Sequence, residues 1–319
     1  MIPEFDVLFA GFPCQPFSSA GNRKGVLDDN GRGTLWEECE KIIKYSINNY
    51  TNKPKAFVFE NVRGIMSSKI QNKLVTEVIK QKMETLGYNV SMKLIRTSDY
   101  GVPQNRFRYL IIGLRKDLGV FDFSTLDKIV DNYNISNVNN DSYELTLGYL
   151  LATMPKELQN KNYWNFSPQS QKMVNMIGPC IDNEIALKDF IIKKPLKEIS
   201  ETIMTGKSWK NINPNDLPER FKKIYDNPKK YHSPNFYRRF ALGEISGTIT
   251  ASAQPENCGI THPFLNRRLS IHEIARIQSF PDDFLFPSKS IHNSYKAIGN
   301  AIPPVLGWVI SKALQDIIT

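Results

Sequence analysis

Short apolar runs alternate with segments of helical periodicity over the first third of the chain. The runs that predict buried strands are Phe5–Ala10, Lys55–Phe59, Val90–Ile95 and Tyr109–Leu114. Between them, apolar residues recur on one face of a helix that begins at Thr34, and a second helix is predicted from Lys69 to Leu86. Gly87 follows that helix and suits a left-handed C-terminal cap. This alternation predicts an α/β fold with a mostly parallel sheet.

The regular pattern stops after about Asp122 and returns only near the C-terminus. Residues 131–141 are rich in Asn and Ser and predict an exposed loop. The stretch 146–265 mixes basic, aromatic and amide residues without a strand–helix rhythm. Such a mixture suits a nucleic-acid surface, and it also suits an ordinary loop-rich domain.

Helical signals resume close to the C-terminus. Ser270 and Glu273 have capping-box spacing and predict the start of a helix. Gly299 is expected in a tight turn before a last amphipathic helix, which begins at Pro303 or Pro304. The predicted division is a core of residues 1–145 and 266–319, interrupted by a smaller, loop-rich domain of residues 146–265.

The composition fits a globular protein with an anionic partner. The 319 residues are 41% hydrophobic and 23% charged, and the net charge is +9. This excess of positive charge favours a polyanionic partner such as nucleic acid. A protein with many solvated surface lysines would have the same net charge without such a partner. The sequence shows no apolar run that predicts a membrane span and no leader pattern before the first strand. We expect a cytosolic protein with reduced thiols.

Cys14 follows the first predicted strand directly, on a turn between Pro13 and Pro16. In an open α/β sheet, ligands and chemistry gather beyond the carboxyl ends of the strands. Glu60 follows the next predicted strand, so a thiol and a carboxyl group are expected near each other. The simpler interpretation makes Cys14 a buried, inert thiol and Glu60 a helix cap or surface carboxylate. The four cysteines lack the C-x-x-C spacing of a zinc site, so no metal is predicted.

Several motifs occur in one order along the chain and together carry far more information than any one of them. They are Gly11–Ser18 (GFPCQPFS), Arg32–Leu35 (RGTL), Glu60–Val62 (ENV), Tyr100–Arg108 (YGVPQNRFR), Arg267–Asp282 and Tyr295–Pro303 (YKAIGNAIP). This series strongly resembles the DNA cytosine-5 methyltransferases, especially the bacterial restriction–modification enzymes, over about the first 120 and last 50 residues. The resemblance implies a Rossmann-like S-adenosylmethionine-dependent methyltransferase core, with a target-recognition domain at residues 146–265.

The resemblance implies roles for four residues in a reaction on cytosine. Cys14 would be the thiolate that adds to carbon 6 of the ring, which makes carbon 5 able to attack a methyl group. Glu60 would hydrogen-bond ring N3 and the exocyclic amine, and it must be protonated or share a proton to do so. Arg108 matches the arginine that binds the base carbonyl oxygen, and Arg106 would brace the site. The target base would be flipped out of the duplex to reach Cys14.

The same resemblance implies contacts to the methyl donor, S-adenosylmethionine, and to double-stranded DNA. The expected cofactor contacts are Pro13, Leu35, Asn300 and Ala301. The expected DNA contacts are Gln15, Ser18, Arg23, Lys24, Arg32, Arg238, Arg239 and Thr250, and further candidates for target recognition are Lys207, Trp209, Thr248 and Ser252. The polar, glycine-rich segment 18–33 would close over the flipped base as a lid. We expect the protein to work in the bacterial cytoplasm, associated with DNA.

The family's first motif, a Phe-x-Gly-x-Gly turn that holds the methionine end of the donor, is expected before Cys14 and is not found there. Phe9-Ala10-Gly11 resembles it only superficially, because it runs directly into the Pro-Cys turn. Three interpretations stay open: an incomplete record of a full enzyme, one subunit of a split methyltransferase whose partner polypeptide supplies the cofactor half, and an inactive DNA-binding fragment. Without the strands that carry this motif in the family, the first strand would be an exposed apolar sheet edge. A thiol enzyme with another substrate is a more distant alternative, because no histidine stands near Cys14 in the sequence.

Overall fold

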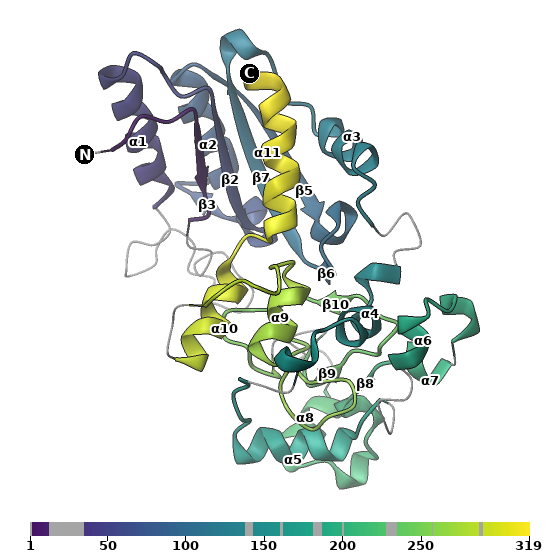
Figure 1. Cartoon of the computed structure of the whole chain (residues 1–319). Coiled ribbons are helices and arrows are strands. Elements are labelled where there is room, and N and C mark those ends of the chain that lie inside the picture. Colours follow the sequence, from purple (N-terminus) through teal and green to yellow (C-terminus); the bar gives the residue numbers. More distant parts are fainter. Residues whose placement is uncertain are drawn as a thin grey trace. The chain divides into compact units, whose positions relative to one another are not determined.

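The computed structural model of the chain contains two compact units (Figure 1). The structure describes residues 2–12, 35–137, 143–159, 162–180, 187–199, 201–227, 235–256, 258–286 and 290–319. The first unit comprises residues 1–96, 107–135 and 307–319, and the second comprises residues 97–106 and 136–306. Each unit has a hydrophobic core of its own.

The first unit is an α/β structure, which confirms the predicted fold class. Its strands are β1 (Val7–Ala10), β2 (Ala56–Val62), β3 (Lys69–Ile70), β4 (Lys73–Leu74), β5 (Tyr88–Arg96) and β7 (Phe107–Arg115). Its helices are α1 (Trp36–Asn49), α2 (Val75–Thr85), α3 (Ser124–Asn132) and, from Gly307 onwards, α11 (Pro304–Ile318).

Four strands of the first unit form one mixed sheet in the order β1-β2-β7-β5. β1 runs parallel to β2, whereas β7 runs antiparallel to both β2 and β5. The prediction of a mostly parallel sheet is therefore wrong for the hydrogen-bonded pairs. The reason is that the chain leaves β5 at Arg96 and returns at Phe107, directly opposite, so the two strands pair as a long hairpin. β7 then separates β5 from β2.

Helices α1 and α2 belong to the core that covers one face of this sheet. Phe57 and Phe59 of β2 are fully buried and share that core with Trp36 and Ile43 of α1. Because side chains alternate along a strand, Glu60 points to the opposite face of the sheet. The burial of Phe57 and Phe59 against the helices thus determines which face of the sheet Glu60 occupies.

Gly113 of β7 stands opposite Phe57 and leaves room for its ring. A Cβ atom at Gly113 would lie 2.0 Å from Phe57 Cε1. We expect Gly113→Ala to lower the free energy of unfolding by about 1–3 kcal/mol, because the overpacked ring must shift. Gly307→Ala in α11 is the control: its Cβ would meet nothing within 4 Å, and a gain of about 0.5–1 kcal/mol is expected there. Denaturant unfolding of both variants checks the prediction, and equal midpoints for wild type and Gly113→Ala would contradict it.

The helix predicted from Lys69 to Leu86 begins later than expected. Residues 69–74 form the hairpin β3–β4, and α2 starts at Val75. The hairpin turn contains Gln71 and Asn72, whose φ angles are 46° and 67°. A right-handed helix cannot include such left-handed residues, which is why the first turn of the predicted helix is lost. The predicted cap is confirmed, since Gly87 has a φ of 98°.

Helix α11 packs as a core helix of the first unit. Val309, Ile310 and Ala313 are fully buried, and Lys55 Nζ donates to the carbonyl oxygen of Ile318 at 2.9 Å. Residues 291–318 are long and apolar enough to cross a membrane by length and composition alone. The chain is extended between the end of α10 and Pro304, however, so this stretch forms two helices, and the buried side of α11 accounts for its hydropathy.

The second unit consists of short elements around its own cores. Its helices are α4 (Leu147–Ala152), α5 (Pro168–Ile177), α6 (Leu187–Ile191), α7 (Glu201–Met204), α8 (Glu219–Tyr225), α9 (Ile271–Ile277) and α10 (Ile291–Asn300). Its strands are β6 (Gln104–Asn105), β8 (Lys207–Ser208), β9 (Arg238–Arg239) and β10 (Ser246–Gly247). The capping box of Ser270 and Glu273 starts α9 as predicted. Gly299 was expected in a tight turn and instead lies in the last turn of α10, because the helix continues to Asn300.

The compact units differ from the division predicted from the sequence. Residues 266–306 pack with the middle of the chain, and only residues 307–319 join the first unit. The reason is visible in the shared core, where Ile274 and Ile298 are buried together with Ile249. A grouping by packing does not test a division by function, so the predicted functional boundaries stay a prediction.

Candidate active site

Glu60 and Arg108 form a buried ion pair on one face of the sheet. Glu60 lies in β2 opposite Leu110, and Arg108 lies in β7 opposite Val62. The two side chains are therefore diagonal neighbours on the same face of an antiparallel pair. Arg108 Nε contacts Glu60 Oε1, and each residue is 8% exposed. A carboxyl group and a guanidinium are thus held together out of bulk water, where opposite charges attract each other more strongly than in water.

Asn61 connects the end of β2 to the segment that leads to Cys14. Its Nδ2 donates to the carbonyl oxygen of Phe12 at 3.2 Å, and the Phe12 ring packs edge-on against Phe59 with centroids 6.0 Å apart. The parallel register of β1 and β2 sets Ala10 opposite Phe59, so both strands end at the same edge of the sheet. The expectation that the two strand ends are parallel neighbours is confirmed.

Many of the predicted site residues lie outside the described residues, because the structure does not describe residues 13–34. They are Pro13, Cys14, Gln15, Ser18, Arg23, Lys24 and Arg32. Their roles stay predictions from the sequence.

The described cysteines are poor candidates for a nucleophile. Cys39, Cys180 and Cys258 are all buried. Burial raises the pKa of each thiol, that of Cys39 to about 11. Because the thiolate is the reactive form, none of the three competes with Cys14 for that role.

Leu35, Asn300 and Ala301 are the predicted cofactor contacts that the structure describes. Leu35 precedes α1 in the first unit, and its apolar side chain is 36% exposed. Asn300 ends α10 in the second unit with an exposed side chain that makes no hydrogen bond to the described residues. The carbonyl oxygen of Ala301 accepts hydrogen bonds from Gln278 Nε2 at 3.1 Å and from Arg106 Nη2 at 3.4 Å. Leu35 and Asn300 each present an accessible side chain within their own unit, whereas the backbone carbonyl group of Ala301 is engaged within the second unit.

Gln104 and Gln278 are buried residues to which the sequence analysis assigned no role. Both are fully buried, and Gln104 Nε2 donates to Gln278 Oε1 at 2.5 Å. Arg106, predicted to brace the site, donates to the carbonyl oxygens of Ile249 and Gly299 at 2.9 and 3.0 Å. Each glutamine lies inside one of the sequence motifs, and this was the only indication in the sequence that it is important. The periodicity of apolar residues did not indicate that either side chain is buried.

Arg239 was predicted to contact DNA, and this prediction is wrong. Its guanidinium is fully buried and donates to the carbonyl oxygens of Val174 at 3.1 Å and of Leu265 at 2.7 Å, among others. Burial lowers its pKa to about 10. Arg239 is therefore a structural arginine. Trp209 is corrected in the same way, because it is 3% exposed within the core around α5 and α8.

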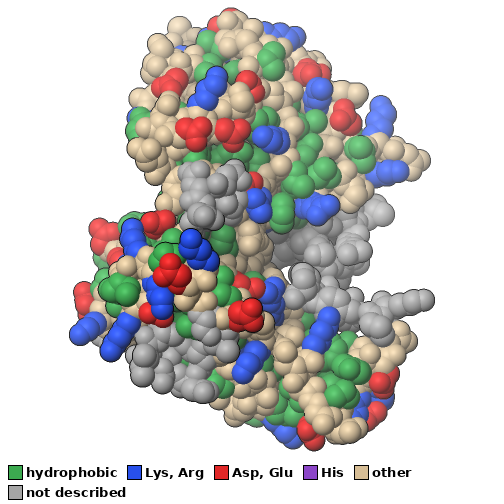
Figure 2. Space-filling model, turned by 90° about the vertical axis from the view of Figure 1, so that its right-hand side faces the viewer, with side chains coloured by type: hydrophobic (Ala, Val, Ile, Leu, Met, Phe, Trp, Pro, Cys, Tyr) green, Lys and Arg blue, Asp and Glu red, His purple; other side chains and the backbone are tan. Residues whose placement is uncertain are grey.

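Arg238 and Thr250 are predicted DNA contacts of the second unit that are partly exposed. Arg238 is partly exposed; it pairs with Glu244, and its guanidinium lies 4.3 Å from the centroid of the Phe240 ring. Thr250 is also partly exposed, and its hydroxyl lies 3.2 Å from that of Ser252. Figure 2 shows described Lys and Arg side chains interspersed with Asp, Glu and hydrophobic side chains on the face in view. On that face, the basic side chains in view are spread among the others rather than gathered in one patch.

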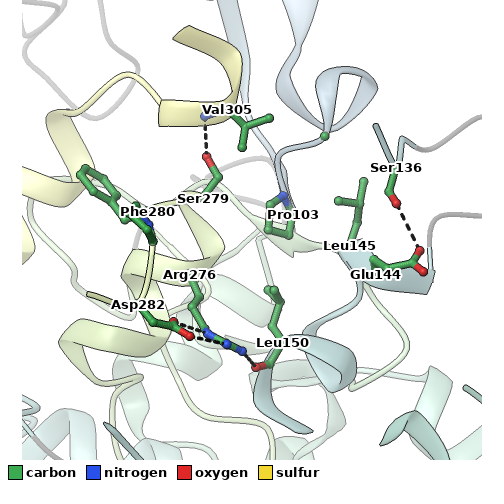
Figure 3. A pocket seen from close by; sticks show the side chains of 12 residues that line it. Pro103, Ser136, Glu144, Leu145, Leu150, Arg276, Ser279, Phe280, Asp282 and Val305 are labelled. Carbon is green, nitrogen blue, oxygen red and sulfur yellow. Dashed lines mark hydrogen bonds and ion pairs between the residues drawn. The ribbon is translucent and has the colours of Figure 1, made fainter. Parts of the chain in front are cut away.

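The second unit also contains an open pocket of about 360 Å³ (Figure 3). Arg276 lies on its wall and binds Asp282 through two contacts of 2.6 Å, while it also donates to the carbonyl oxygen of Leu150 at 2.7 Å. Ser279 Oγ accepts a hydrogen bond from the backbone N–H of Val305 at 3.1 Å. These polar groups are satisfied within the unit and leave little for a ligand, so the pocket is not assigned a role in the chemistry.

His262 is buried in the second unit beside Glu273. Its Nδ1 accepts from the backbone N–H of Leu265 at 3.2 Å, and its Nε2 lies 3.7 Å from Glu273 Oε1. Burial lowers the pKa of His262 to about 3. The ring is therefore neutral in the folded protein at pH values where an unfolded histidine, with a pKa of about 6.5, becomes charged.

We expect His262 to make the protein less stable as the pH falls from about 6.5 towards 3. In this window the unfolded chain binds a proton that the folded chain does not, so the free energy of unfolding falls by up to about 1.4 kcal/mol per pH unit for this group. Thermal unfolding across this pH range should show a shallower decline for His262→Gln than for wild type. His292→Gln, at an exposed position on α10, should keep the wild-type slope. Equal slopes for all three proteins would contradict the account.

Comparison with known proteins gives one consistent result. A family model described as C-5 cytosine-specific DNA methylase matches residues 1–316. The chain is 29% identical to the Type II methyltransferase M.BanI of Aneurinibacillus aneurinilyticus, over 99% of this chain and 81% of that protein. It is 30% identical to the Type II methyltransferase M.FnuDI of Fusobacterium nucleatum, over 100% of this chain and 78% of that protein. The fold is similar to that of the S. pombe Dnmt2 methyltransferase, with a TM-score of 0.50, 13% identity, and coverage of 98% of this chain and 79% of that chain.

Proposed function

The chain belongs to the C-5 cytosine-specific DNA methylase family and is a cytosine-5 DNA methyltransferase of the restriction–modification type. From this premise, we propose that it methylates carbon 5 of a flipped-out cytosine, within one DNA sequence, through a covalent adduct with Cys14. Methylation of that sequence would protect DNA in the bacterial cytoplasm from a cognate restriction enzyme.

The buried pair of Glu60 and Arg108 is the observation that carries this proposal. The two groups stand side by side at the carboxyl end of β2, and the last described residue before Cys14 is Phe12, which Asn61 holds at the same edge. Because Cys14 follows Phe12 by two residues in the sequence, this arrangement supports a site in which the thiol, the carboxyl group and the guanidinium act on one base.

The proposed steps on the base assign one task to each group. The Cys14 thiolate forms a bond to carbon 6, and the electron pair of the 5,6 double bond becomes available at carbon 5. Glu60 donates a hydrogen bond to ring N3 and accepts one from the exocyclic amine, which stabilises the charge that builds on the ring. Arg108 donates to the base carbonyl oxygen. After carbon 5 has taken the methyl group, it loses its proton to a base, the double bond re-forms, and Cys14 leaves as a thiolate.

The pairing of Glu60 with Arg108 implies a change when the base enters. In the structure, Arg108 Nε contacts the carboxyl group that must itself face the cytosine. We expect the arginine to divide its donors between Glu60 and the base carbonyl oxygen, because a guanidinium carries several donors in a fixed fork. A base stacked in duplex DNA cannot reach this pair, so flipping is required, and segment 18–33 is the proposed lid.

S-adenosylmethionine, on which the family depends, carries both apolar and hydrogen-bonding groups. Leu35 in the first unit presents an exposed apolar side chain, and Asn300 in the second unit presents an exposed amide, so each residue by itself suits the contact predicted for it. When bound, the cofactor supplies an electrophilic methyl group. The task of the protein's own residues is to hold the base and to keep water from the adduct.

The function is tested by mapping methylation in a bacterial host that lacks cytosine methylation of its own. We expect bisulfite sequencing of host DNA to show 5-methylcytosine at one short recurring sequence when the chain is expressed. Salt-sensitive DNA binding without any methylation would instead support the inactive DNA-binding alternative.

The open edge of β1 favours a second arrangement, in which another polypeptide completes the enzyme. Among the described strands, β1 pairs only with β2, and its apolar Phe9 is 37% exposed. An uncovered apolar edge is a natural place for a strand of another chain to pair. We propose that this partner would add an apolar strand beside β1 and supply further contacts to S-adenosylmethionine.

This arrangement predicts that the chain methylates DNA only when the partner polypeptide is also present. The chain should methylate DNA together with the product of a neighbouring gene that encodes a Phe-x-Gly-x-Gly segment, and Phe9→Lys should abolish both co-purification and methylation. Val120→Lys is the control, because Val120 is 68% exposed in the same unit but lies outside β1. Full methylation by the purified chain alone would exclude the need for a partner.

A further inference from the structure

Gln104, Arg106 and Gln278 are buried side chains that join two backbone segments of the second unit. Each of the three is 2% exposed or less. One segment, 248–250, contains Thr250, which is predicted to contact DNA. The other, 298–301, contains Asn300, which is predicted to contact the methyl donor. The contacts of the three side chains show how closely the two segments are held.

The first segment is fixed at Ile249. Arg106 Nη1 donates to its carbonyl oxygen at 2.9 Å, and Gln104 Oε1 accepts from its N–H at 3.1 Å. The neighbouring Thr248 Oγ1 donates to the carbonyl oxygen of Asn105 at 3.1 Å. Since β6 and β10 also pair directly, Ser246 and Gly247 lie opposite Gln104 and Asn105. Thr250 is therefore positioned by the residue before it.

The second segment is fixed at the last carbonyl groups of α10, where the regular hydrogen bonds of the helix end. Arg106 Nη2 donates to the carbonyl oxygen of Gly299 at 3.0 Å, and Gln278 Nε2 donates to that of Ile298 at 2.8 Å. A cation at the C-terminus of a helix is also favoured by the helix dipole. The guanidinium of Arg106 thus reaches both segments at once, one through each terminal nitrogen.

Gly299 allows the two backbones to touch. A Cβ atom at this position would lie 2.5 Å from the carbonyl carbon of Thr250 and 2.5 Å from the backbone nitrogen of Ala251. Both are backbone atoms, which cannot move aside as a flexible side chain could. The two segments are therefore in direct contact as well as connected by hydrogen bonds.

We propose that Arg106, supported by Gln104 and Gln278, is a positioning residue that fixes Thr250 relative to Asn300. The inference rests on the proposed function, which assigns Thr250 to DNA and Asn300 to the methyl donor. A misplacement of about 1 Å in such a site can cost about 10²-fold in rate. A lysine would keep the charge but not the fork, so it cannot hold both carbonyl groups in the same geometry.

Amide hydrogen exchange of the unliganded chain tests the connection itself. In Arg106→Lys, exchange should become about tenfold faster in both segments, 248–250 and 298–301, because charge-assisted hydrogen bonds are lost at each. Arg268→Lys is the matched control: Arg268 is also buried, and it donates to the carbonyl oxygens of Ala253, Trp164 and Asn165, none of which lies in either segment. The control should lose stability without this paired effect. A change in one segment alone, or the same change in the control, would overturn the proposal.

Ligand binding provides the second readout. Arg106→Lys should weaken the binding of S-adenosylhomocysteine, measured by calorimetry, and of duplex DNA, measured by fluorescence anisotropy, each by about tenfold. Gly299→Ala should do the same, and the double variant should be no worse than the poorer single variant, because both changes break one connection. Additive effects would overturn the proposal. If the wild-type chain binds neither probe and methylates no DNA, the proposed function fails, and the exchange experiment still decides the positioning role.

Discussion

Cys14→Ala should abolish methyl transfer, with a loss of about 10⁴-fold or more, because removal of a nucleophile leaves only binding and electrostatic stabilisation. The substitution removes the sulfur that would bond to carbon 6, and the described cysteines cannot replace it. Cys39, Cys180 and Cys258 are buried, with raised pKa values. Incorporation of a labelled methyl group into DNA that carries the mapped sequence measures the loss.

Cys39→Ala is the control for Cys14→Ala. Cys39 packs in the core between α1 and the sheet, so its loss should lower thermal stability and leave methyl transfer within about threefold of wild type. Methyl transfer by Cys14→Ala at a rate within tenfold of wild type would show that this thiol is not the nucleophile.

Glu60→Gln should slow the chemical step by about 10²–10⁴-fold, the usual contribution of a positioned acid or base. Glutamine keeps the size of the side chain and leaves an oxygen atom facing Arg108. It cannot supply a proton in answer to the charge that builds on ring N3. Single-turnover kinetics should therefore show a reduced rate with DNA binding preserved.

Asp117→Asn is the matched control for Glu60→Gln. Asp117 is paired with Arg115 through a contact of 2.7 Å in the same unit, but Asp117 is exposed, and Arg115 lies at the opposite end of β7 from Arg108. Its loss should leave the single-turnover rate unchanged. A Glu60→Gln enzyme with a wild-type rate would contradict the proposed role, and so would a loss confined to DNA affinity.

The α/β class and the strand ends could be predicted because they depend on local apolar patterns. β2 begins with the apolar run Ala56–Phe59, which Glu60 follows, and the pattern indicated its burial directly. The antiparallel direction of β7 could not be predicted in the same way. It depends on pairing with β5 across residues 97–106, and the sequence there resembles any strand–loop–strand connection.

The buried polar residues mark the limit of sequence reasoning. Arg239 stands among basic and aromatic residues that suit a nucleic-acid surface, yet it is fully buried and bound to backbone carbonyl groups. Arg238 is partly exposed. Neighbouring residues of one type can thus differ completely in environment, because strand side chains alternate in direction and burial is decided by distant segments. The contact between Gln104 and Gln278 could not be predicted either, because these residues are also distant in the sequence.

The central claim is that Cys14 forms a covalent bond to the target cytosine with the help of Glu60 and Arg108. It is tested most directly with duplex DNA that carries 5-fluorocytosine at the mapped position, because fluorine at carbon 5 prevents the final release of the enzyme. With S-adenosylmethionine present, we expect a protein–DNA adduct that survives denaturation, and peptide mapping should place the DNA on Cys14. Methylation of ordinary DNA without any trapped adduct, or an adduct on another residue, would contradict the account.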